Sequence, residues 1–135
     1  MASITSPFNI FIDGQPIAPP PPPTFSENYV HAALGNKGGP AALLRVVNDY
    51  IESGDWYLDT HPLEQSNGLY RKIYWLRKSV FRLKEGQKVL VQKQGNTSTV
   101  KVAGYPLCKR SVDNNVWSDH VGGPFGSRVI VTLVG

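Results

Sequence analysis

The residues with the clearest chemical potential form a basic segment in the second half of the chain. Eleven lysines and arginines, and a single acid, lie between Arg71 and Arg110. Aromatic side chains alternate with the first of these cations, namely Tyr70, Tyr74, Trp75 and Phe81. Cations neutralise phosphates and release their counterions, and aromatic faces stack on unpaired bases. The combination is typical of surfaces that bind single-stranded nucleic acid.

We therefore expect a nucleic-acid-binding surface in this segment, with Tyr74 or Trp75 stacking on bases. The predicted binding residues are Arg71, Lys72, Tyr74, Trp75, Arg77, Lys78, Arg82, Lys84 and Lys88. The alternative is an amphipathic element with a solvated cationic face and its aromatic rings in the core. Lys88 and Lys93 fall on opposite faces of a later strand, which weakens the nucleic-acid interpretation.

Cys108 and His120 could in principle form a nucleophile and base pair. The simpler interpretation is a small buried thiol and a loop histidine. None of His31, His61 and His120 has a second histidine or a cysteine at ligand spacing, so we predict no metal site. We also predict no cofactor and no catalytic residue, and hence a protein that is not an enzyme.

Two further groups of residues are weak candidates. Asp55, Asp59 and Glu64 resemble a carboxylate cluster, but nothing in the sequence places them together, and a solvated acidic edge is the default. The loop at residues 35–40 is rich in glycine but lacks the Gly-Lys-Ser/Thr ending of a phosphate loop. We interpret it as a flexible connection.

Charge is distributed unevenly along the chain. Residues 1–70 carry two basic and seven acidic side chains, a balance of −5, and residues 71–135 carry twelve basic and three acidic ones, a balance of +9. Such separation concerns partners and association, not the fold. It predicts attraction between copies of the chain or toward a polyanion.

Length and composition set the general class. The chain has 135 residues and is 41% apolar, which fits one modest core. No apolar run approaches the roughly 20 residues that span a bilayer, so no membrane partner is expected. One cysteine, Cys108, and an N-terminus unlike a signal peptide favour a cytoplasmic location or one within a viral particle.

The first elements that position these residues are a strand and a stiff arm. Residues 8–15 are typical of a short strand ending in an Asp-Gly turn. The unbroken prolines Pro19–Pro23 favour the polyproline II conformation. We therefore divide the chain into an N-terminal strand and proline-rich arm, residues 1–23, and a single α+β domain, residues 24–135.

Helices are predicted next. A capping box at Thr24–Glu27 predicts a short helix to Leu34. Pro40 fits the first position of a second helix that ends at Ser53-Gly54. Leu69, Ile73, Leu76, Val80 and Leu83 recur at helical spacing and predict a third, with a strand over residues 79–83 as the alternative.

The remainder of the chain has the period of strands. Residues 88–92 and 97–103 flank a turn at Gln94-Gly95-Asn96 and predict a hairpin. Residues 105–110 could add a strand, and residues 128–134 predict an apolar final strand. The predicted fold class is α+β, with two or three helices in the first 84 residues and a small antiparallel sheet in the last 50.

Three functions follow from these patterns. The first is a self-associating structural protein, such as a small viral coat or particle component, whose basic segment contacts nucleic acid. The second is a monomeric module that binds single-stranded nucleic acid. The third is a small enzyme that uses Cys108 and His120. The first requires that the proline arm reaches a neighbouring copy and that the opposite charges stay apart on the folded surface.

Overall fold

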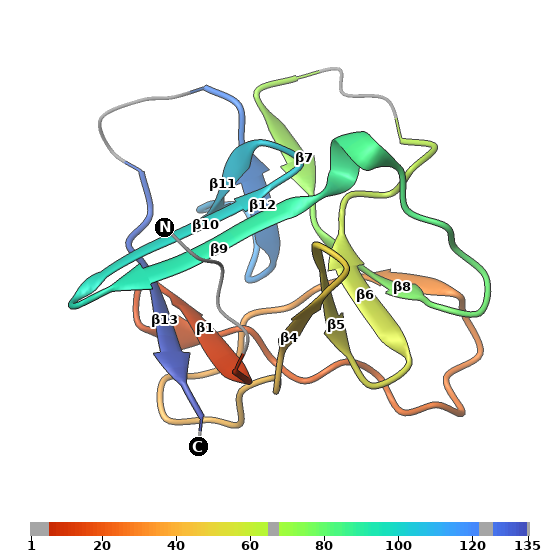
Figure 1. The fold of residues 1–135 in the computed structure, drawn as a ribbon, viewed down its shortest axis with the longest axis horizontal. Coiled ribbons are helices and arrows are strands. Elements are labelled where there is room, and N and C mark those ends of the chain that lie inside the picture. The colour runs from red at the N-terminus through yellow and green to blue at the C-terminus, as the bar shows by residue number, and fades with distance from the viewer. Residues whose placement is uncertain (1–5, 65–67, 122–125, 135) are drawn as a thin grey trace.

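The computed structural model describes residues 6–64, 68–121 and 126–134, and its regular elements are almost all antiparallel strands (Figure 1). The first sheet has the order β13-β1-β2, the second β7-β12-β11-β10-β9 and the third β3-β8-β6-β5-β4. Their bounds are β1 Phe8–Ile12, β2 Gln15–Pro16, β3 Tyr29–His31, β4 Arg45–Val47, β5 Tyr50–Ser53, β6 Trp56–Asp59, β7 Tyr70–Lys72, β8 Tyr74–Arg77, β9 Val89–Gln94, β10 Thr97–Val102, β11 Tyr105–Lys109, β12 Val116–Asp119 and β13 Val129–Leu133.

The predicted α+β class is wrong, because all three expected helices are replaced by strands and turns. In the described ranges the one helical element is a single 3₁₀ turn, η1, at Glu85–Gln87. The capping-box segment from Thr24 stays irregular and leads into β3 instead. Its carbonyl groups bond to a distant arginine, Arg77, and not to amides four residues onward.

The second predicted helix is a β-hairpin formed by β4 and β5. Asn48 and Asp49 both have positive φ, 52° and 69°, which is the geometry of a two-residue hairpin turn. The apolar residues that matched a helical face divide accordingly, since Leu44 and Ile51 are buried while Leu43 and Val47 are exposed. An Asn-Asp pair between β-branched and aromatic residues was the sequence signal for this turn.

The third predicted helix is a pair of short strands, β7 and β8, followed by a turn. Of its five-residue apolar stripe, Ile73 and Leu76 are buried, whereas Leu69 and Val80 are more than half exposed. Aromatic and β-branched residues dominate Tyr70–Trp75, and these pack well on a pleated surface. The strand alternative over residues 79–83 fails as well, because that stretch lies outside every strand.

The strand predictions for the rest of the chain are confirmed. The N-terminal strand is β1, and Asp13 and Gly14 both have positive φ in the turn after it. β9 and β10 form the expected hairpin, and β11 and β13 are the other two predicted strands. Strand β1 pairs with β13 of the same chain, with Ile10 opposite Val131.

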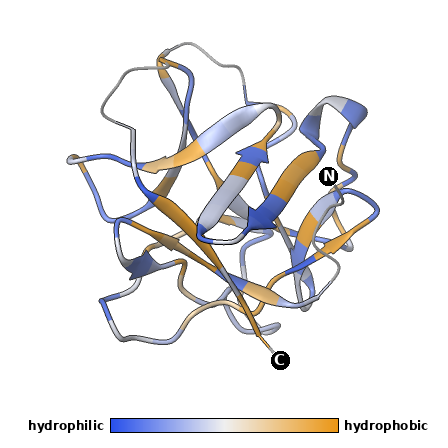
Figure 2. Ribbon diagram, turned by 60° about the vertical axis from the view of Figure 1, so that its left-hand side comes forward, coloured by the Kyte–Doolittle hydropathy of each residue, from blue (hydrophilic) through white to orange (hydrophobic). Residues whose placement is uncertain are grey.

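The core gathers side chains from all three sheets. Phe8, Ile10 and Ile12 of β1 share one buried cluster with Trp56 and Trp75. Residues far apart in sequence therefore form a common interior, and Figure 2 shows apolar colour along most of the ribbon that ends at the C-terminus. The edge of β13 is capped by the hairpin, because Ser98 Oγ accepts from the Val131 amide and Lys93 Nζ donates to its carbonyl.

The proline run packs against its own fold. Pro20, Pro21 and Pro23 border a small pocket with Trp56, and Pro19 and Pro21 border another with Val30 and Trp75. Figure 1 shows this segment passing along the lower side of the molecule toward β8. The arm is therefore placed against its own chain in this structure.

Arg77 at the end of β8 fastens the segment that follows the prolines. Its guanidinium donates to the carbonyls of Pro23, Phe25 and Glu27 at 3.1, 2.6 and 3.0 Å and to Asn28 Oδ1 at 3.2 Å. The same group lies 4.4 Å from the centre of the Trp56 ring. The guanidinium is a planar group with several N–H donors, so it can bond to all of these oxygens at once. A lysine ammonium cannot match this arrangement.

Arg77→Lys should therefore destabilise the protein although it retains the charge. We expect a loss of about 2 kcal/mol in the free energy of unfolding, since bonds from a charged donor contribute roughly 1.5–3 kcal/mol each and part of this site is solvated. Urea denaturation measures the loss. Arg82→Lys is the matched control, because Arg82 is exposed, and it should change stability by less than about 0.5 kcal/mol. Equal stability of the two variants would contradict this account.

Candidate nucleic-acid interface

One face of the third sheet is built from aromatic side chains. In β8, Trp75 packs in the core cluster, so its neighbours Tyr74 and Leu76 point to the opposite face of the sheet, where Tyr74 is partly exposed and Leu76 is buried. The register places His31 and the buried Asp59 beside Tyr74, and Tyr29 beside Leu76, on that same face. Alternation along three strands therefore gathers these side chains although the sequence separates them by up to 47 positions.

The rings on this face contact one another in an unbroken series. Tyr29 lies edge-on to Tyr74, His61 and Phe81, with centroid separations of 5.8, 4.9 and 6.2 Å. His31 joins Tyr74, at 5.8 Å, to Trp117 of β12, at 4.9 Å. We call this series the aromatic row; it comprises Trp117, His31, Tyr74, Tyr29, His61 and Phe81. It crosses from the second sheet to the third.

The row ends in a cation held between two rings. The Arg110 guanidinium lies 4.7 Å from the Trp117 ring and 4.5 Å from the Tyr70 ring. Lys72, opposite Trp117 in the strand register, is exposed and acts electrostatically on His31. Arg110 and Lys72 therefore place positive charge beside the rings at this end. Such an arrangement suits a single strand whose bases stack on the rings and whose phosphates contact the cations.

The row stays partly open to solvent. Tyr29 is 48% exposed, and a shallow pocket of about 210 Å³ opens between Tyr29, Tyr74, His61, Leu63 and Glu64. Burial and the nearby Glu64 carboxylate raise the pKa of Tyr74, and burial lowers the pKa of His31. Both groups are therefore neutral near pH 7, so the row presents uncharged faces with cations at its side.

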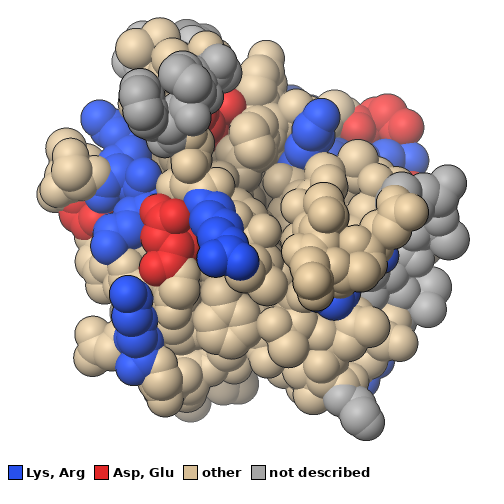
Figure 3. All heavy atoms as spheres, turned by 90° about the vertical axis from the view of Figure 1, so that its left-hand side faces the viewer, with Lys and Arg blue, Asp and Glu red and all other residues tan. Residues whose placement is uncertain are grey.

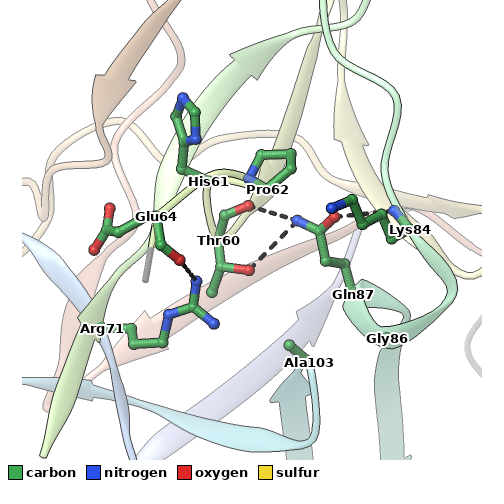
Figure 4. A pocket seen from close by; sticks show the side chains of 9 residues that line it. All are labelled: Thr60, His61, Pro62, Glu64, Arg71, Lys84, Gly86, Gln87 and Ala103. Carbon is green, nitrogen blue, oxygen red and sulfur yellow. Dashed lines mark hydrogen bonds between the residues drawn. The ribbon is translucent and has the colours of Figure 1, made fainter. Parts of the chain in front are cut away.

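A second pocket adjoins the row and shares His61 and Glu64 with the shallow pocket beside Tyr29 and Tyr74. It encloses about 270 Å³ and we call it the Arg71 pocket. Its lining is Thr60, His61, Pro62, Glu64, Arg71, Lys84, Gly86, Gln87 and Ala103 (Figure 4). Gln87 shapes one wall, because its amide donates to the Thr60 carbonyl at 2.7 Å and accepts from the Lys84 amide at 2.9 Å.

Arg71 and Asp59 are incompletely paired at this pocket. Arg71 Nη2 donates to the Glu64 carbonyl at 2.8 Å, while its buried Nε has no partner among the described residues. Asp59 Oδ1 accepts from the amide and hydroxyl of Thr60, but its buried Oδ2 has no such partner. Burial raises the pKa of Asp59 to about 7, and Arg71 and the Thr60 bonds only partly oppose the shift.

Four of the nine predicted binding residues border the row or the pocket. Tyr74 is part of the row and Lys72 lies beside it, while Arg71 and Lys84 line the Arg71 pocket. Arg82 is exposed in the turn after β8. The expected surface is thus partly assembled, from strands and loops instead of one helical face.

The other four predicted residues lie elsewhere or are already engaged. Trp75 is 2% exposed and belongs to the core, so it cannot stack on a base. Arg77 holds the segment after the prolines. Lys78 pairs with Glu52 at 2.6 Å, and Lys88 pairs with Glu85 and Asp49 at 3.0 and 3.7 Å.

No match to this chain was found among models of protein families, curated proteins or solved structures.

The proposed nucleophile and base do not meet. Cys108 lies opposite Trp117, on one face of the second sheet. His120 comes directly after β12 and lies on the other face of the sheet. Its Nε2 contacts Ser118 Oγ at 3.2 Å, and its ring stacks on Tyr105 with the ring centroids 3.5 Å apart. Burial raises the pKa of Cys108 to about 12, which keeps the thiol protonated and unreactive. This geometry gives the enzyme hypothesis no support.

Neither a metal-binding cluster nor a membrane-spanning helix occurs among the described residues. These residues contain no group of three or more His, Cys, Asp or Glu side chains that could hold a metal ion. Nor does any helix within ranges 6–64, 68–121 and 126–134 have the length and apolarity to cross a membrane.

Opposite charges from the two halves of the chain intermix on the surface. Lys78 and Lys88, from the basic half, pair with Glu52 and Asp49 from the acidic half. Figure 3 shows one face on which basic and acidic side chains lie next to each other and broad areas carry neither. The −5 and +9 balances of the sequence do not become two separate poles on this face.

Sequence reasoning missed several members of this surface, namely Tyr29, His31, His61, Arg110 and Trp117. A signal existed for one pair, since Tyr29 and His31 are two residues apart and share a face once the segment is taken as a strand. The others come from loops or a distant strand. Only the tertiary fold brings them into contact.

Asp59 should make stability depend on pH in an unusual direction. Its pKa is about 7 in the folded chain and near 3.8 when unfolded, so between these values the folded state binds more protons. Stability from this group is complete below pH 4 and is lost as the pH rises to about 7. The loss is on the order of 4 kcal/mol, at about 1.4 kcal/mol per pKa unit.

Asp59→Asn tests this, because the amide oxygen retains the bonds from Thr60 but does not titrate. Urea denaturation of both proteins at pH 4 and pH 7.5 gives the difference in unfolding free energy between them. We expect wild type to lose stability relative to the variant at the higher pH. A difference that is the same at both pH values would show that folding does not raise the pKa of Asp59.

Proposed function

We propose that this protein binds single-stranded nucleic acid on the aromatic row, with the cations beside the row contacting the phosphate backbone. The observation that carries the proposal is the unbroken series of rings, all partly exposed or exposed except Trp117, with Arg110 and Lys72 at its Trp117 end and Arg71 in the adjoining pocket. Base stacking on aromatic side chains contributes about 1–3 kcal/mol per base and tolerates any sequence.

Unpaired strands fit this surface better than a duplex. The bases of a duplex are stacked on each other and offer no free face, whereas those of a single strand can lie against Tyr29 and Tyr74. The basic residues near the row are few and dispersed, and do not form the continuous stripe that tracks a duplex backbone. Affinity is therefore expected to be moderate and to come largely from stacking.

Self-association, the other part of the first hypothesis, has less support. The proline arm packs in cis, the β13 edge is capped by Ser98 and Lys93, and charges from both halves pair within the chain. Each of these removes a feature that had favoured contact between copies. Nucleic-acid binding does not require any of them, so we propose it by itself.

Tyr29→Ala should weaken binding of a single-stranded oligonucleotide by about 5- to 100-fold, which corresponds to the loss of one stacked base. Fluorescence anisotropy with labelled RNA and DNA of the same sequence measures the affinity. Tyr29→Phe keeps the ring and should bind as wild type does. Leu43→Ala is a matched control, because Leu43 has the same exposed fraction as Tyr29, 48%, and lies outside the row. Unchanged affinity of Tyr29→Ala would reject the row as the binding surface.

The cation beside the row gives a second prediction. Lys72→Ala should reduce the slope of log affinity against log salt concentration by about 0.7, the value for one contact with a single strand. Lys101→Ala removes the same charge from an exposed position on β10 and should leave the slope unchanged. If both variants lower the slope equally, general charge and not the row determines binding.

A further inference from the structure

The Arg71 pocket presents hydrogen-bond donors that the fold does not use. Arg71 has five N–H donors, and within the described part of the chain only Nη2 has a hydrogen-bond acceptor. Figure 4 shows the tip of the guanidinium turned into the space between Thr60, Gln87 and Ala103. Lys84 also lines the pocket, on the far side of the Gln87 amide from Arg71 in Figure 4, and its ammonium forms no ion pair with any described residue.

The other polar groups of the pocket are occupied or turned away. Gln87 and Thr60 bond to each other and to backbone groups, as described above. Figure 4 shows the Glu64 carboxylate directed away from the enclosed space, toward the row. What remains at the pocket is therefore the part of the Arg71 guanidinium not bonded to the Glu64 carbonyl, together with the exposed Lys84 ammonium, and two cations of this kind are the complement of an anion.

We infer that the Arg71 pocket is a subsite for a terminal phosphate monoester of the single strand that lies on the aromatic row. The inference rests on the proposed function. A terminal phosphate carries close to two negative charges at pH 7, which matches Arg71 and Lys84. A phosphate inside the strand carries only one charge, so a terminal phosphate is the better match for two cations.

The location of the pocket supports this assignment. It shares His61 and Glu64 with the opening beside Tyr29 and Tyr74, so a nucleotide stacked on the row has its phosphate side near Arg71. Among the described residues, Asp59 is the one acid buried close to Arg71, and burial raises its pKa to about 7. Below that pH it therefore neutralises little of the Arg71 charge.

The experiment compares oligonucleotides of about ten residues and one sequence, carrying either hydroxyl ends, a 5′-phosphate or a 3′-phosphate. We expect one phosphorylated form to bind roughly tenfold more tightly than the hydroxyl form, the effect of one charge-assisted contact. Arg71→Lys and Lys84→Ala should reduce that advantage toward unity. Lys88→Ala is the control, since Lys88 follows the same 3₁₀ turn but pairs with Glu85 and Asp49. Equal binding of the three oligonucleotides by wild type would overturn the inference.

Titration with a nucleoside monophosphate and with inorganic phosphate, followed by ³¹P NMR, tests the pocket even if no oligonucleotide binds. Saturable binding of the monophosphate that Lys84→Ala abolishes would support the subsite and leave only the strand-binding proposal refuted. Absence of saturable binding would refute the subsite. Binding of inorganic phosphate combined with equal affinity for all three oligonucleotides would also overturn it, because the pocket would then take the free anion and not a strand end.

Discussion

The register of β8 between β3 and β6 is the constraint on which the rest of this structure depends. It directs Trp75 and Arg77 to one face of the sheet and Tyr74 and Leu76 to the other. A slip of one residue would exchange these faces and place Tyr74 on the side of Trp56 and the main core cluster. The two flanking strands have the same alternation, so His31, Tyr29 and the buried Asp59 share the face of Tyr74. The core tryptophans and the aromatic row are therefore two consequences of one pairing.

Arg77 connects this register to the N-terminal segment. On the inner side of β8 it rests on Trp56 and bonds to three carbonyls after the prolines. These bonds take the place of the helix that a capping box at Thr24–Glu27 predicted, because carbonyls satisfied by a guanidinium need no amide from a following turn. A distant cation has overridden a local signal.

Tertiary contacts also explain why the acidic and basic halves of the sequence intermix after folding. Antiparallel pairing places early residues such as Glu52 beside later ones such as Lys78.

The parts of the fold that could be predicted from sequence are those decided over short distances. The Asp13-Gly14 turn and the Gly95-Asn96 turn each fix a strand end by backbone geometry, and the strands beside them were found. The segments mistaken for helices carry apolar residues whose spacing fits both the helical period and the strand period, as at Leu43 to Ile51. There the positive φ of Asn48 and Asp49 turns the chain into a hairpin, and pairing of β5 with β6 stabilises the strands.

The candidate site was predicted in part, because Arg71, Lys72 and Tyr74 lie on two short strands, β7 and β8, that follow each other in the sequence. The partners from loops and other sheets, such as His61, Trp117 and Arg110, are brought there by contacts between sheets that no local pattern encodes.

The incomplete pairing of Asp59 and Arg71 deserves a physical reason, because a buried polar atom without a partner costs about 1–3 kcal/mol. A leucine at position 59 would avoid the cost but would release the Thr60 amide and hydroxyl, which Asp59 Oδ1 now holds. Thr60 in turn positions Gln87, and Gln87 shapes the wall of the Arg71 pocket. The acid therefore maintains the shape of a pocket in which, among the described residues, the side-chain donors left without an acceptor belong to cations. A fold selected for stability alone has no need of such a pocket, whereas unpaired and perturbed groups concentrate where a protein meets a ligand. A ligand at Arg71 is therefore favoured even before its chemistry is considered.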